Sequence, residues 1–384
     1  MKKKTAMVCM AVLFFTLGAT AQTKAVKVES PIVTEKDFVW YVEQKNAWKE
    51  VTRQHPQDET AWLNYYHAAR YMLWFQQEDT TARQVIREMS QAIPDSYTFN
   101  YCAYSAIMGG HGTGETDADK YAEAALAMLP EDMQFFDYDR WVCYLAMKGD
   151  EARMKPLAKR YFDSGIYSED VLRYNYNELA GMDEGGIIIA NGDAAVIPKW
   201  LIQEGMNAHR DKTVVCAAFL AIKDYREWLS KKLGMVFPEW ESGDYASYDA
   251  YEQALLQAII DKYGSKVYFS TTTLQQTIEP WKEHLFNEGL TLKYSKKPYD
   301  NMAAKRRNVE ERYMMEYLLV AFRPDWTAGQ RLSANYAVLL ADLLPYYAKH
   351  DQKRYDWLMR LLVCGVTNTS LSEERKQEIL QLLM

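Results

Sequence analysis

The chain has 384 residues, of which 48% are hydrophobic and 25% charged, and its formal net charge is −7. This acidic balance disfavours nucleic acids and anionic membranes as partners, because both carry negative charge. The length exceeds what one hydrophobic core usually organises, so two or three domains are expected.

The first 21 residues have the three parts of a secretory signal peptide. Lysines at positions 2–4 precede an apolar stretch, and Ala19 to Ala21 form a small-residue cleavage site. The apolar stretch is shorter than the roughly 20 residues that a membrane-spanning helix needs. We therefore expect an exported protein, periplasmic or secreted, that is soluble once residues 1–21 are removed. The 42 basic and 52 acidic side chains left after cleavage would give a net charge of −10.

Four cysteines would remain after cleavage, and they lie far apart: Cys102, Cys143, Cys216 and Cys364. There is no C-x-x-C pair and no histidine at ligand spacing, so no metal site is expected. A disulfide between Cys102 and Cys143 would require the two to face each other across adjacent helices. Four buried free thiols are the alternative.

Residues 34–183 have a helical pattern that repeats. Pro56, Pro94 and Pro130 are separated by 38 and 36 residues, and each is followed closely by an acidic residue. An aromatic-rich helix is expected after each of them. A proline that closes one helix pair and an acidic cap that opens the next are typical of tetratricopeptide-like repeats, in which each pair needs its neighbours to bury its second face.

Tryptophans are frequent in this helical domain, at Trp40, Trp48, Trp62, Trp74 and Trp141. Aromatic side chains at helical spacing usually fill the gaps between stacked helix pairs. They also stack well on sugar rings, and a concave helical array suits peptide binding. The sequence therefore leaves two roles for these tryptophans, packing between helices and lining a binding groove.

Residues 184–300 change to an alternation of strands and helices. Short apolar runs predict strands at Gly186–Ala190, Thr213–Phe219, Lys266–Ser270 and Thr291–Tyr294. Helices are expected between them, at Pro198–Gly205, Tyr225–Leu233, Tyr248–Tyr263 and Leu274–Glu288. This order predicts a mostly parallel, Rossmann-like α/β sheet with right-handed crossovers. No G-x-G-x-x-G motif is present, so neither a dinucleotide nor another cofactor is expected.

The most informative part of this domain is the polar loop Asn191-Gly192-Asp193, which follows the first predicted strand. Open α/β sheets bind ligands at the carboxyl ends of their strands, where backbone donors and side chains converge. Asp193 has an alternative role as the cap of the following helix. We take six residues in and after this loop as candidates for ligand binding: Asn191, Asp193, Trp200, Glu204, Arg210 and Asp211.

Three ordered blocks between Gly185 and Ser295 resemble a known family, the soluble carboxyl-terminal region of bacterial protein O-mannosyltransferase-like membrane glycosyltransferases. In that family a strand runs into an N-G-D-N-D loop and a P-x-W-x-x-Q-E helix, followed later by V-Y-F-A and E-G-L-x-Y segments. This chain supplies, in that order, Asn191, Gly192, Asp193, Pro198, Trp200, Gln203, Glu204, Arg210, Asp211, Tyr268, Phe269, Glu288, Gly289 and Leu290. The resemblance implies an envelope protein associated with glycan or glycoprotein processing.

Two departures from that family limit what the resemblance implies. The membrane half that resembles the catalytic portion of lipid-linked sugar transferases is absent, so a glycosyl-transfer mechanism does not carry over. Ala194-Ala195 replaces the second Asn-Asp of the loop, which removes two oxygen ligands. Asp193 alone is a poor cation site, because hard cations prefer several oxygens.

Other arrangements for catalysis have little support. Ser270, Asp193 and His209 would form a triad, but no G-x-S-x-G elbow is present. Glu204 and Asp211 would form a pair of carboxylates, although on an exposed helix and turn such side chains usually stay solvated. No catalytic residue is assigned.

Residues 301–384 return to amphipathic helices with short polar breaks. The basic run Lys305-Arg306-Arg307 is expected to be a solvated linker. We predict an exported, non-enzymatic binding or scaffold protein that presents its helical and α/β surfaces to a protein or glycan of the cell envelope. The alternatives are an enzyme of envelope glycans, with loop ends at 191–193, 221–224 and 270–273, or an accessory subunit of a membrane glycosyltransferase.

Overall fold

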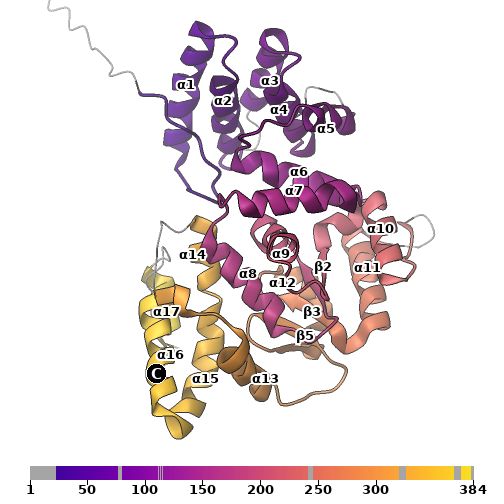
Figure 1. The fold of residues 1–384 in the computed structure, drawn as a ribbon, viewed down its shortest axis with the longest axis vertical. Helices are drawn as coiled ribbons and strands as arrows, with labels where there is room; N and C mark the ends of the chain where they lie inside the picture. The colour runs from indigo at the N-terminus through magenta and orange to yellow at the C-terminus, as the bar shows by residue number, and fades with distance from the viewer. Residues whose placement is uncertain are drawn as a thin grey trace, which may run out of the picture.

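The computed structural model describes residues 23–76, 80–110, 112, 114, 116–240, 245–319, 326–366 and 373–381. The protein is mostly helical, with one small five-stranded mixed sheet near its middle (Figure 1). The expected signal peptide, residues 1–21, lies outside the described residues. Within the described part of the chain, no helix combines the length and the apolar character that crossing a bilayer requires.

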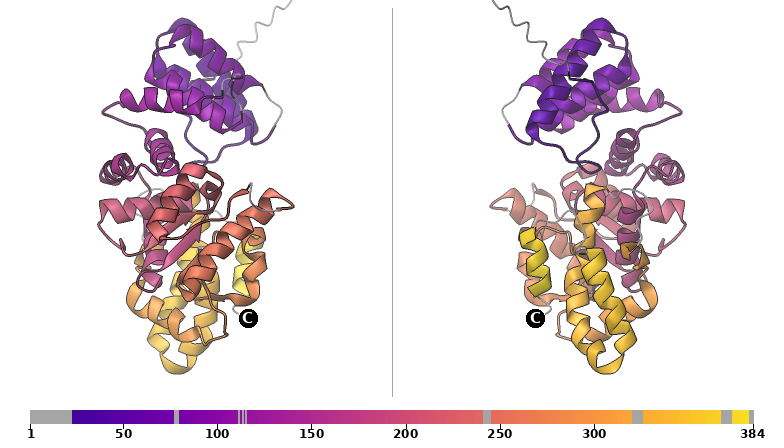
Figure 2. Two further views of the ribbon diagram at one scale, coloured as in Figure 1. Left: turned by 90° about the vertical axis from the view of Figure 1, so that its right-hand side faces the viewer. Right: turned by 90° about the vertical axis from the view of Figure 1, so that its left-hand side faces the viewer.

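The amino-terminal part consists of helices that pack against their neighbours in the sequence, at one end of an elongated molecule (Figure 2). They are α1 (Phe38–Gln54), α2 (Glu59–Met72), α3 (Thr81–Ala92), α4 (Tyr97–Met108), α5 (Ala118–Ala127), α6 (Phe135–Met147) and α7 (Glu151–Asp163). Helix α2 also contacts α4, so alternate helices lie side by side. The repeated apolar faces of the sequence are thereby buried between successive pairs.

The acidic caps expected after each proline occur only once. The Asp58 carboxylate accepts from the Ala61 amide at 3.1 Å and starts α2. Ser96 starts α4 instead of an acid, and Gln134 starts α6, where its own amide donates to Asp137 at 2.9 Å. Hydroxyl and amide side chains cap the free amides of a helix start as effectively as carboxylates. The acidic residues after each proline therefore did not predict the capping residue.

Five strands form the sheet in the order β2-β1-β3-β5-β4. They are β1 (Ile187–Ala190), β2 (Thr213–Cys216), β3 (Val267–Ser270), β4 (Leu285–Asn287) and β5 (Thr291–Tyr294). Strands β2, β1 and β3 are parallel, whereas β5 is antiparallel to both β3 and β4. The sheet is mixed, so the predicted mostly parallel, Rossmann-like sheet is not confirmed.

The difference arises in residues 274–288, for which one helix was expected. Helix α12 (Gln275–Ile278) is a single turn, and Pro280 opens a tighter 3₁₀ helix, Glu279–His284. Proline lacks the amide that would continue an α-helix. The chain then extends into β4, and only three residues, including Gly289 at φ +128°, lead to β5. So short a connection permits only antiparallel pairing.

Helix α9 (Asp193–Gly205) packs on β2 and α11 (Tyr248–Tyr263) packs on β3. Helix α10 (Lys223–Leu233) reaches the end of β2, where the Tyr225 hydroxyl accepts from the Cys216 amide at 3.0 Å. The second strand is shorter than expected, because residues 217–221 form a 3₁₀ helix. All four side chains of β1 are buried, as expected for the central strand of the parallel part.

Helix α8 (Glu169–Gly181) lies against α9 and is joined to it by a fully buried ion pair. The Lys199 ammonium and the Glu178 carboxylate are 2.6 Å apart, and both side chains are 0% exposed. Lys199 also donates to Asn175 Oδ1 at 2.6 Å, and Ser270 Oγ donates to the other Glu178 oxygen at 2.5 Å. Two helices and strand β3 therefore share one hydrogen-bonded network.

The carboxyl-terminal helices lie at the opposite end of the molecule from α1–α5 (Figure 1). They are α13 (Met302–Arg307), α14 (Thr327–Ser333), α15 (Tyr336–His350), α16 (Gln352–Arg360) and α17 (Glu373–Gln381). Short 3₁₀ or π turns occur at Gly264–Lys266, Asn308–Arg312, Glu316–Leu319 and Leu361–Val366.

The basic run at residues 305–307 is not the solvated linker that was expected. Lys305 is only 6% exposed and its ammonium lies 2.6 Å from the Asp342 carboxylate. Arg306 lies over the Tyr346 ring, with 4.2 Å to the ring centroid. The run forms part of α13 and docks that helix on α15.

An extended segment, residues 23–37, connects the two ends of the molecule. Its Val28 is 1% exposed among side chains of α1 and α2, and the Val28 amide donates to Asn64 Oδ1 at 2.7 Å. Further along, the amides of Thr327 and Ala328 donate to the carbonyls of Val33 and Ile32 at 3.1 and 3.0 Å. The segment therefore ties the first helices to α14.

We expect Val28→Asp to lower the free energy of unfolding by about 3 kcal/mol or more, since it places an unpaired charge in an apolar contact. Val26→Asp is the matched control, because Val26 is 40% exposed. Urea denaturation followed by circular dichroism measures both. Equal effects of the two substitutions would contradict the role given to the segment.

We expect Lys199→Met to cost about 3–5 kcal/mol, because it leaves the buried Glu178 charge without a partner. Adding Glu178→Gln to it should recover part of the loss by removing that charge. The exposed pair of Lys159 and Asp163 offers a control, in which Lys159→Met should change the unfolding free energy by less than about 0.5 kcal/mol. A similar cost for both lysines would refute this account.

Candidate ligand-binding pocket

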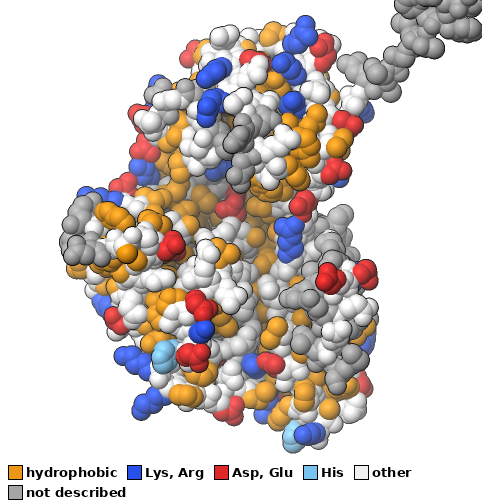
Figure 3. Space-filling model, turned by 180° about the vertical axis from the view of Figure 1, so that it is seen from behind, with side chains coloured by type: hydrophobic (Ala, Val, Ile, Leu, Met, Phe, Trp, Pro, Cys, Tyr) orange, Lys and Arg blue, Asp and Glu red, His pale blue; other side chains and the backbone are white. Residues whose placement is uncertain are grey.

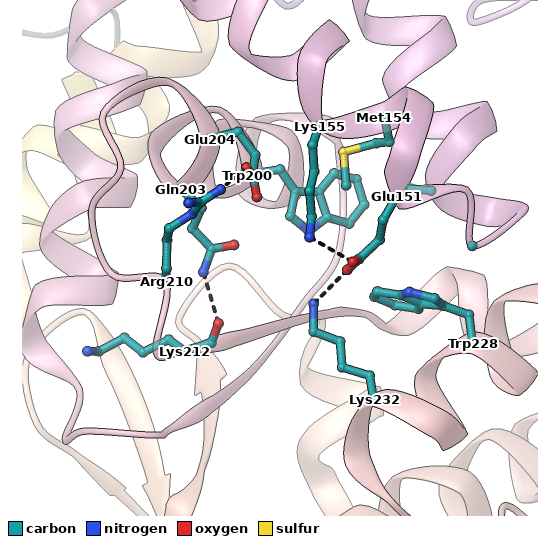
Figure 4. Close-up of a pocket in the computed structure, with 12 residues that line it drawn as sticks. Glu151, Met154, Lys155, Trp200, Gln203, Glu204, Arg210, Lys212, Trp228 and Lys232 are labelled. Atoms are coloured by element: carbon teal, nitrogen blue, oxygen red, sulfur yellow. Dashed lines mark hydrogen bonds and ion pairs between the residues drawn. The ribbon is translucent and has the colours of Figure 1, made fainter.

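A pocket of about 250 Å³ lies where α7, α9, α10 and the turn before β2 meet (Figure 4). It is smaller than the roughly 300–1,000 Å³ of pockets for drug-sized ligands, and its size suits one compact group of a larger molecule. Its lining consists of Ala146, Gly149, Glu151, Met154, Lys155, Trp200, Gln203, Glu204, Arg210, Lys212, Trp228 and Lys232.

Helix α9 supplies one wall through Trp200, Gln203 and Glu204. These positions share a helix face, because residues three and four apart are neighbours on a helix surface. The Gln203 amide donates to the carbonyls of Lys212 and His209, both at 2.9 Å, and so holds the turn before β2. Glu204 forms an ion pair with Arg210 from that turn. The turn thus presents the Arg210 guanidinium to the pocket.

Helices α7 and α10 supply the opposite wall. Glu151 accepts from Lys155 at 2.7 Å and from Lys232 at 3.1 Å, so both ammonium groups converge on one carboxylate (Figure 4). Lys232 also lies over the Trp228 ring, 4.7 Å from its centroid. Burial alone would raise the pKa of Glu151, but the two lysines lower it below its ordinary value. The carboxylate is therefore ionised at neutral pH.

Gly149 allows Trp228 to reach this wall. Its φ is +64°, a conformation that favours glycine, and a Cβ placed there would lie 2.5 Å from the Trp228 Cβ. A similar close approach occurs between α7 and α9, where a Cβ on Gly205 would lie 2.2 Å from the Phe162 ring. Both glycines let neighbouring helices pack closely around the pocket.

Three of the six candidate residues line this pocket, and three do not. Trp200, Glu204 and Arg210 belong to it. Asn191 precedes α9 and Asp193 is its first residue, about 10 Å from the nearest pocket residue of that helix, Trp200, at a rise of ~1.5 Å per residue. Asp211 lies outside the lining, where it accepts from the Gly185 amide at 3.1 Å and from Lys212 at 2.9 Å.

Side chains of the protein form hydrogen bonds with one another between the ends of β1 and β3, next to the expected ligand site. Strand order reverses between β1 and β3, which is where such sheets usually bind ligands. There Ser270 is 0% exposed and bonded to Glu178, and the Thr273 hydroxyl donates to the Ile189 carbonyl at 3.3 Å. Asp193 does not cap α9; Gly192 is the capping residue, with φ +91°, and Asp193 is the first helical residue.

Sequence reasoning missed the wall formed by Glu151, Lys155, Trp228 and Lys232. Each helix carries part of a signal, because Glu151 and Lys155, like Trp228 and Lys232, are four residues apart and share a face. Nothing in that spacing brings α7 and α10 together, since Glu151 and Lys232 are 81 residues apart in the chain. Only the packing of the helices does so.

Within the described residues, no group of three or more histidine, cysteine or acidic side chains is placed to hold a metal ion. Cys102, Cys143 and Cys216 have free thiols, so the structure contains no disulfide between Cys102 and Cys143. Cys102 and Cys216 are buried and Cys143 is partly so. The side chain of Cys364 lies outside the described part.

Comparisons with protein families, with curated proteins and with solved structures find no match to this chain. The resemblance to the glycosyltransferase region stays a prediction from the quoted motifs. The pocket's own chemistry is therefore the basis for assigning a function.

We expect Gly149→Ala to displace Trp228 and to destabilise the protein by about 2–4 kcal/mol, through backbone strain and the clash together. Gly165→Ala is the matched control, because Gly165 has φ +62° and a Cβ there meets nothing within 4 Å. Gly165→Ala should cost only the strain, about 1 kcal/mol. Thermal unfolding and tryptophan fluorescence distinguish the two; identical behaviour would contradict the close approach to Trp228.

Proposed function

We propose that this chain is an exported, non-enzymatic binding or scaffold protein of the cell envelope, and that its pocket between α7, α9 and α10 binds part of a glycan. The observation that carries the proposal is the combination of two tryptophans, Trp200 and Trp228, with ion-paired polar groups around one small cavity. An amphipathic ligand with apolar faces and many hydroxyls fits such a lining.

The polar groups of the pocket support a hydroxyl-rich ligand. Glu151 and Glu204 offer carboxylate acceptors, while Lys155, Lys232 and Arg210 offer donors. Each charge already has a partner of opposite sign, so a neutral ligand adds hydrogen bonds without leaving a charge unpaired. The partly exposed Trp228 ring provides flat apolar surface for the C–H face of a sugar, and the buried Trp200 backs the cavity.

The same ion pairs argue against catalysis in this pocket. Glycoside hydrolysis requires one carboxylic acid that is protonated at the working pH and a second carboxylate. Glu151 has a lowered pKa, so it is not suited to donate a proton. Binding is thus the role that the lining favours.

We extend the proposal to the two finer fold assignments, the tetratricopeptide-like repeats and the Rossmann-like core. Successive packed helices from α1 to α7 support tetratricopeptide-like repeats, whose stacked pairs present extended surfaces to partners. The parallel strands β2, β1 and β3 support a small Rossmann-like core that carries an antiparallel extension. The pocket draws on both parts, so one ligand would contact helical and α/β surfaces together.

The alternative is an enzyme or an accessory subunit in envelope glycan or glycoprotein processing. Its support is the motif resemblance around Asn191 to Asp193 and Trp200 to Glu204. An accessory subunit would co-purify with a membrane glycosyltransferase in stoichiometric amounts. Such a complex, unaffected by changes in the pocket, would favour this alternative over glycan binding.

We expect tryptophan fluorescence of the chain without residues 1–21 to change saturably with oligosaccharides released from an envelope preparation. Trp228→Ala should weaken that binding by at least about tenfold, since aromatic anchors carry much of the affinity of a site. Trp74→Ala is the control, because Trp74 is 61% exposed and lies outside the pocket.

Unchanged affinity in Trp228→Ala would refute the pocket as the glycan site. Cleavage of the oligosaccharides by the wild-type chain, abolished by Glu204→Gln, would refute the non-enzymatic role.

A further inference from the structure

A second set of polar side chains gathers at the other end of α9, where α2, α4 and α6 face the sheet part of the molecule. The surface is hollowed between the amino-terminal helices and the rest, and hydrophobic side chains are gathered along the hollow (Figure 3). Arg140 on α6 lies within electrostatic range of Tyr101 and Tyr104 on α4. Asp139 on α6 likewise interacts with Arg70 on α2. Alternate helices thus direct their polar residues to one region.

Asp139 and Arg140 are partly exposed, yet each carries a buried polar atom that lacks a partner. Asp139 Oδ1 and Arg140 Nε have no hydrogen-bond partner among the described residues. An unsatisfied buried polar group costs about 1–3 kcal/mol, more when it is charged. Two such groups on adjacent residues that still reach solvent are suited to a ligand that completes their hydrogen bonds.

The buried side chains near Asp139 and Arg140 also carry polar atoms that lack a hydrogen-bond partner. His67 and Tyr66 on α2 are 1% and 0% exposed, and Tyr101 and Tyr104 on α4 are 0% and 1% exposed. His67 Nε2 and the three hydroxyls also have no hydrogen-bond partner in the described part of the chain. All four side chains interact electrostatically with Arg140. The unsatisfied polar atoms therefore come from three helices and lie within electrostatic range of one guanidinium.

The sheet part adds a second carboxylate to this cluster. Helix α6 packs on α9, and Asp193 in the first turn of α9 interacts electrostatically with both Asp139 and Arg140. Asp193 is exposed, so the cluster opens to solvent on that side. The position that the sequence singled out after β1 thus lies between the end of that strand and helix α6.

We propose that Asp139, Arg140 and Asp193, with Arg70 beside them, form a second ligand site that takes a neutral, hydroxyl-rich group such as a sugar residue. The site shares no residue with the pocket between α7, α9 and α10, so it does not rest on the function proposed for that pocket. Helix α9 joins the two sites, which would let one extended glycan contact both ends of the helix.

The hydrogen-bonding groups of the cluster suit this class of ligand. The Arg70 and Arg140 guanidiniums donate hydrogen bonds and the Asp193 carboxylate accepts them, so a hydroxyl has both kinds of partner there. Burial, and then the nearby Asp193 charge, raises the pKa of Asp139 well above its ordinary value. A protonated carboxyl both donates and accepts hydrogen bonds, as a hydroxyl partner requires.

The test is isothermal titration of the chain without residues 1–21 with mannotriose and with the trisaccharide of N-acetylglucosamine. Arg140→Met should weaken binding of at least one of them by about tenfold or more, since it removes a charged hydrogen-bond donor. Asp193→Asn should weaken it by at least about threefold, and this exposed substitution keeps the test valid if Arg140→Met unfolds. Asp132→Asn, on an exposed turn residue, is the control for Asp193→Asn.

Trp228→Ala separates the two sites, because it changes only the pocket between α7, α9 and α10. Two separate sites would be supported if Arg140→Met and Asp193→Asn abolish one sugar-binding event. A second binding event, which Trp228→Ala abolishes, should persist in both of those variants. The proposal is overturned if neither trisaccharide binds, if both bind with Asp193→Asn as with the wild type, or if the dipeptide Gly-Gly binds this cluster in preference to the sugars.

Discussion

The buried ion pair of Lys199 and Glu178 is the constraint on which the positions of both sites depend. Two charges without access to water must face each other, and their remaining hydrogen bonds must be satisfied. This requirement fixes how α9 is rotated about its axis and how closely it packs against α8. Ser270 extends the same network to strand β3. With α9 held in this way, Trp200 and Glu204 face α7 and α10, while Asp193 faces α6.

The same network reaches the carboxyl end of strand β3. Ser270 at that end donates to the buried Glu178, which pairs with the buried Lys199. The two proposed ligand sites lie instead at contacts between the sheet part and the helices, where Gly149 and Gly205 permit close packing.

Much of the local structure was predictable from periodicity. Strands β1, β3 and β5 and helix α11 lie within a residue of their predicted bounds, because short apolar runs and amphipathic periods depend only on neighbouring residues. Two predictions were wrong. Pro280 ends the helix expected over residues 274–288, and β4 follows. The basic run at 305–307 is not solvated, because it contacts acidic and aromatic side chains of α15.

The sequence by itself determined the helical and strand periods, the aromatic richness of the helices and the importance of α9 with its flanking loop. Tertiary structure alone decided which of the six candidate residues lie together. Trp200, Glu204 and Arg210 line one pocket with residues of α7 and α10, whereas Asp193 lies within electrostatic range of Asp139 and Arg140. Side chains separated by tens of residues interact only through the packing of whole helices, and pattern within one segment carries no information about that packing.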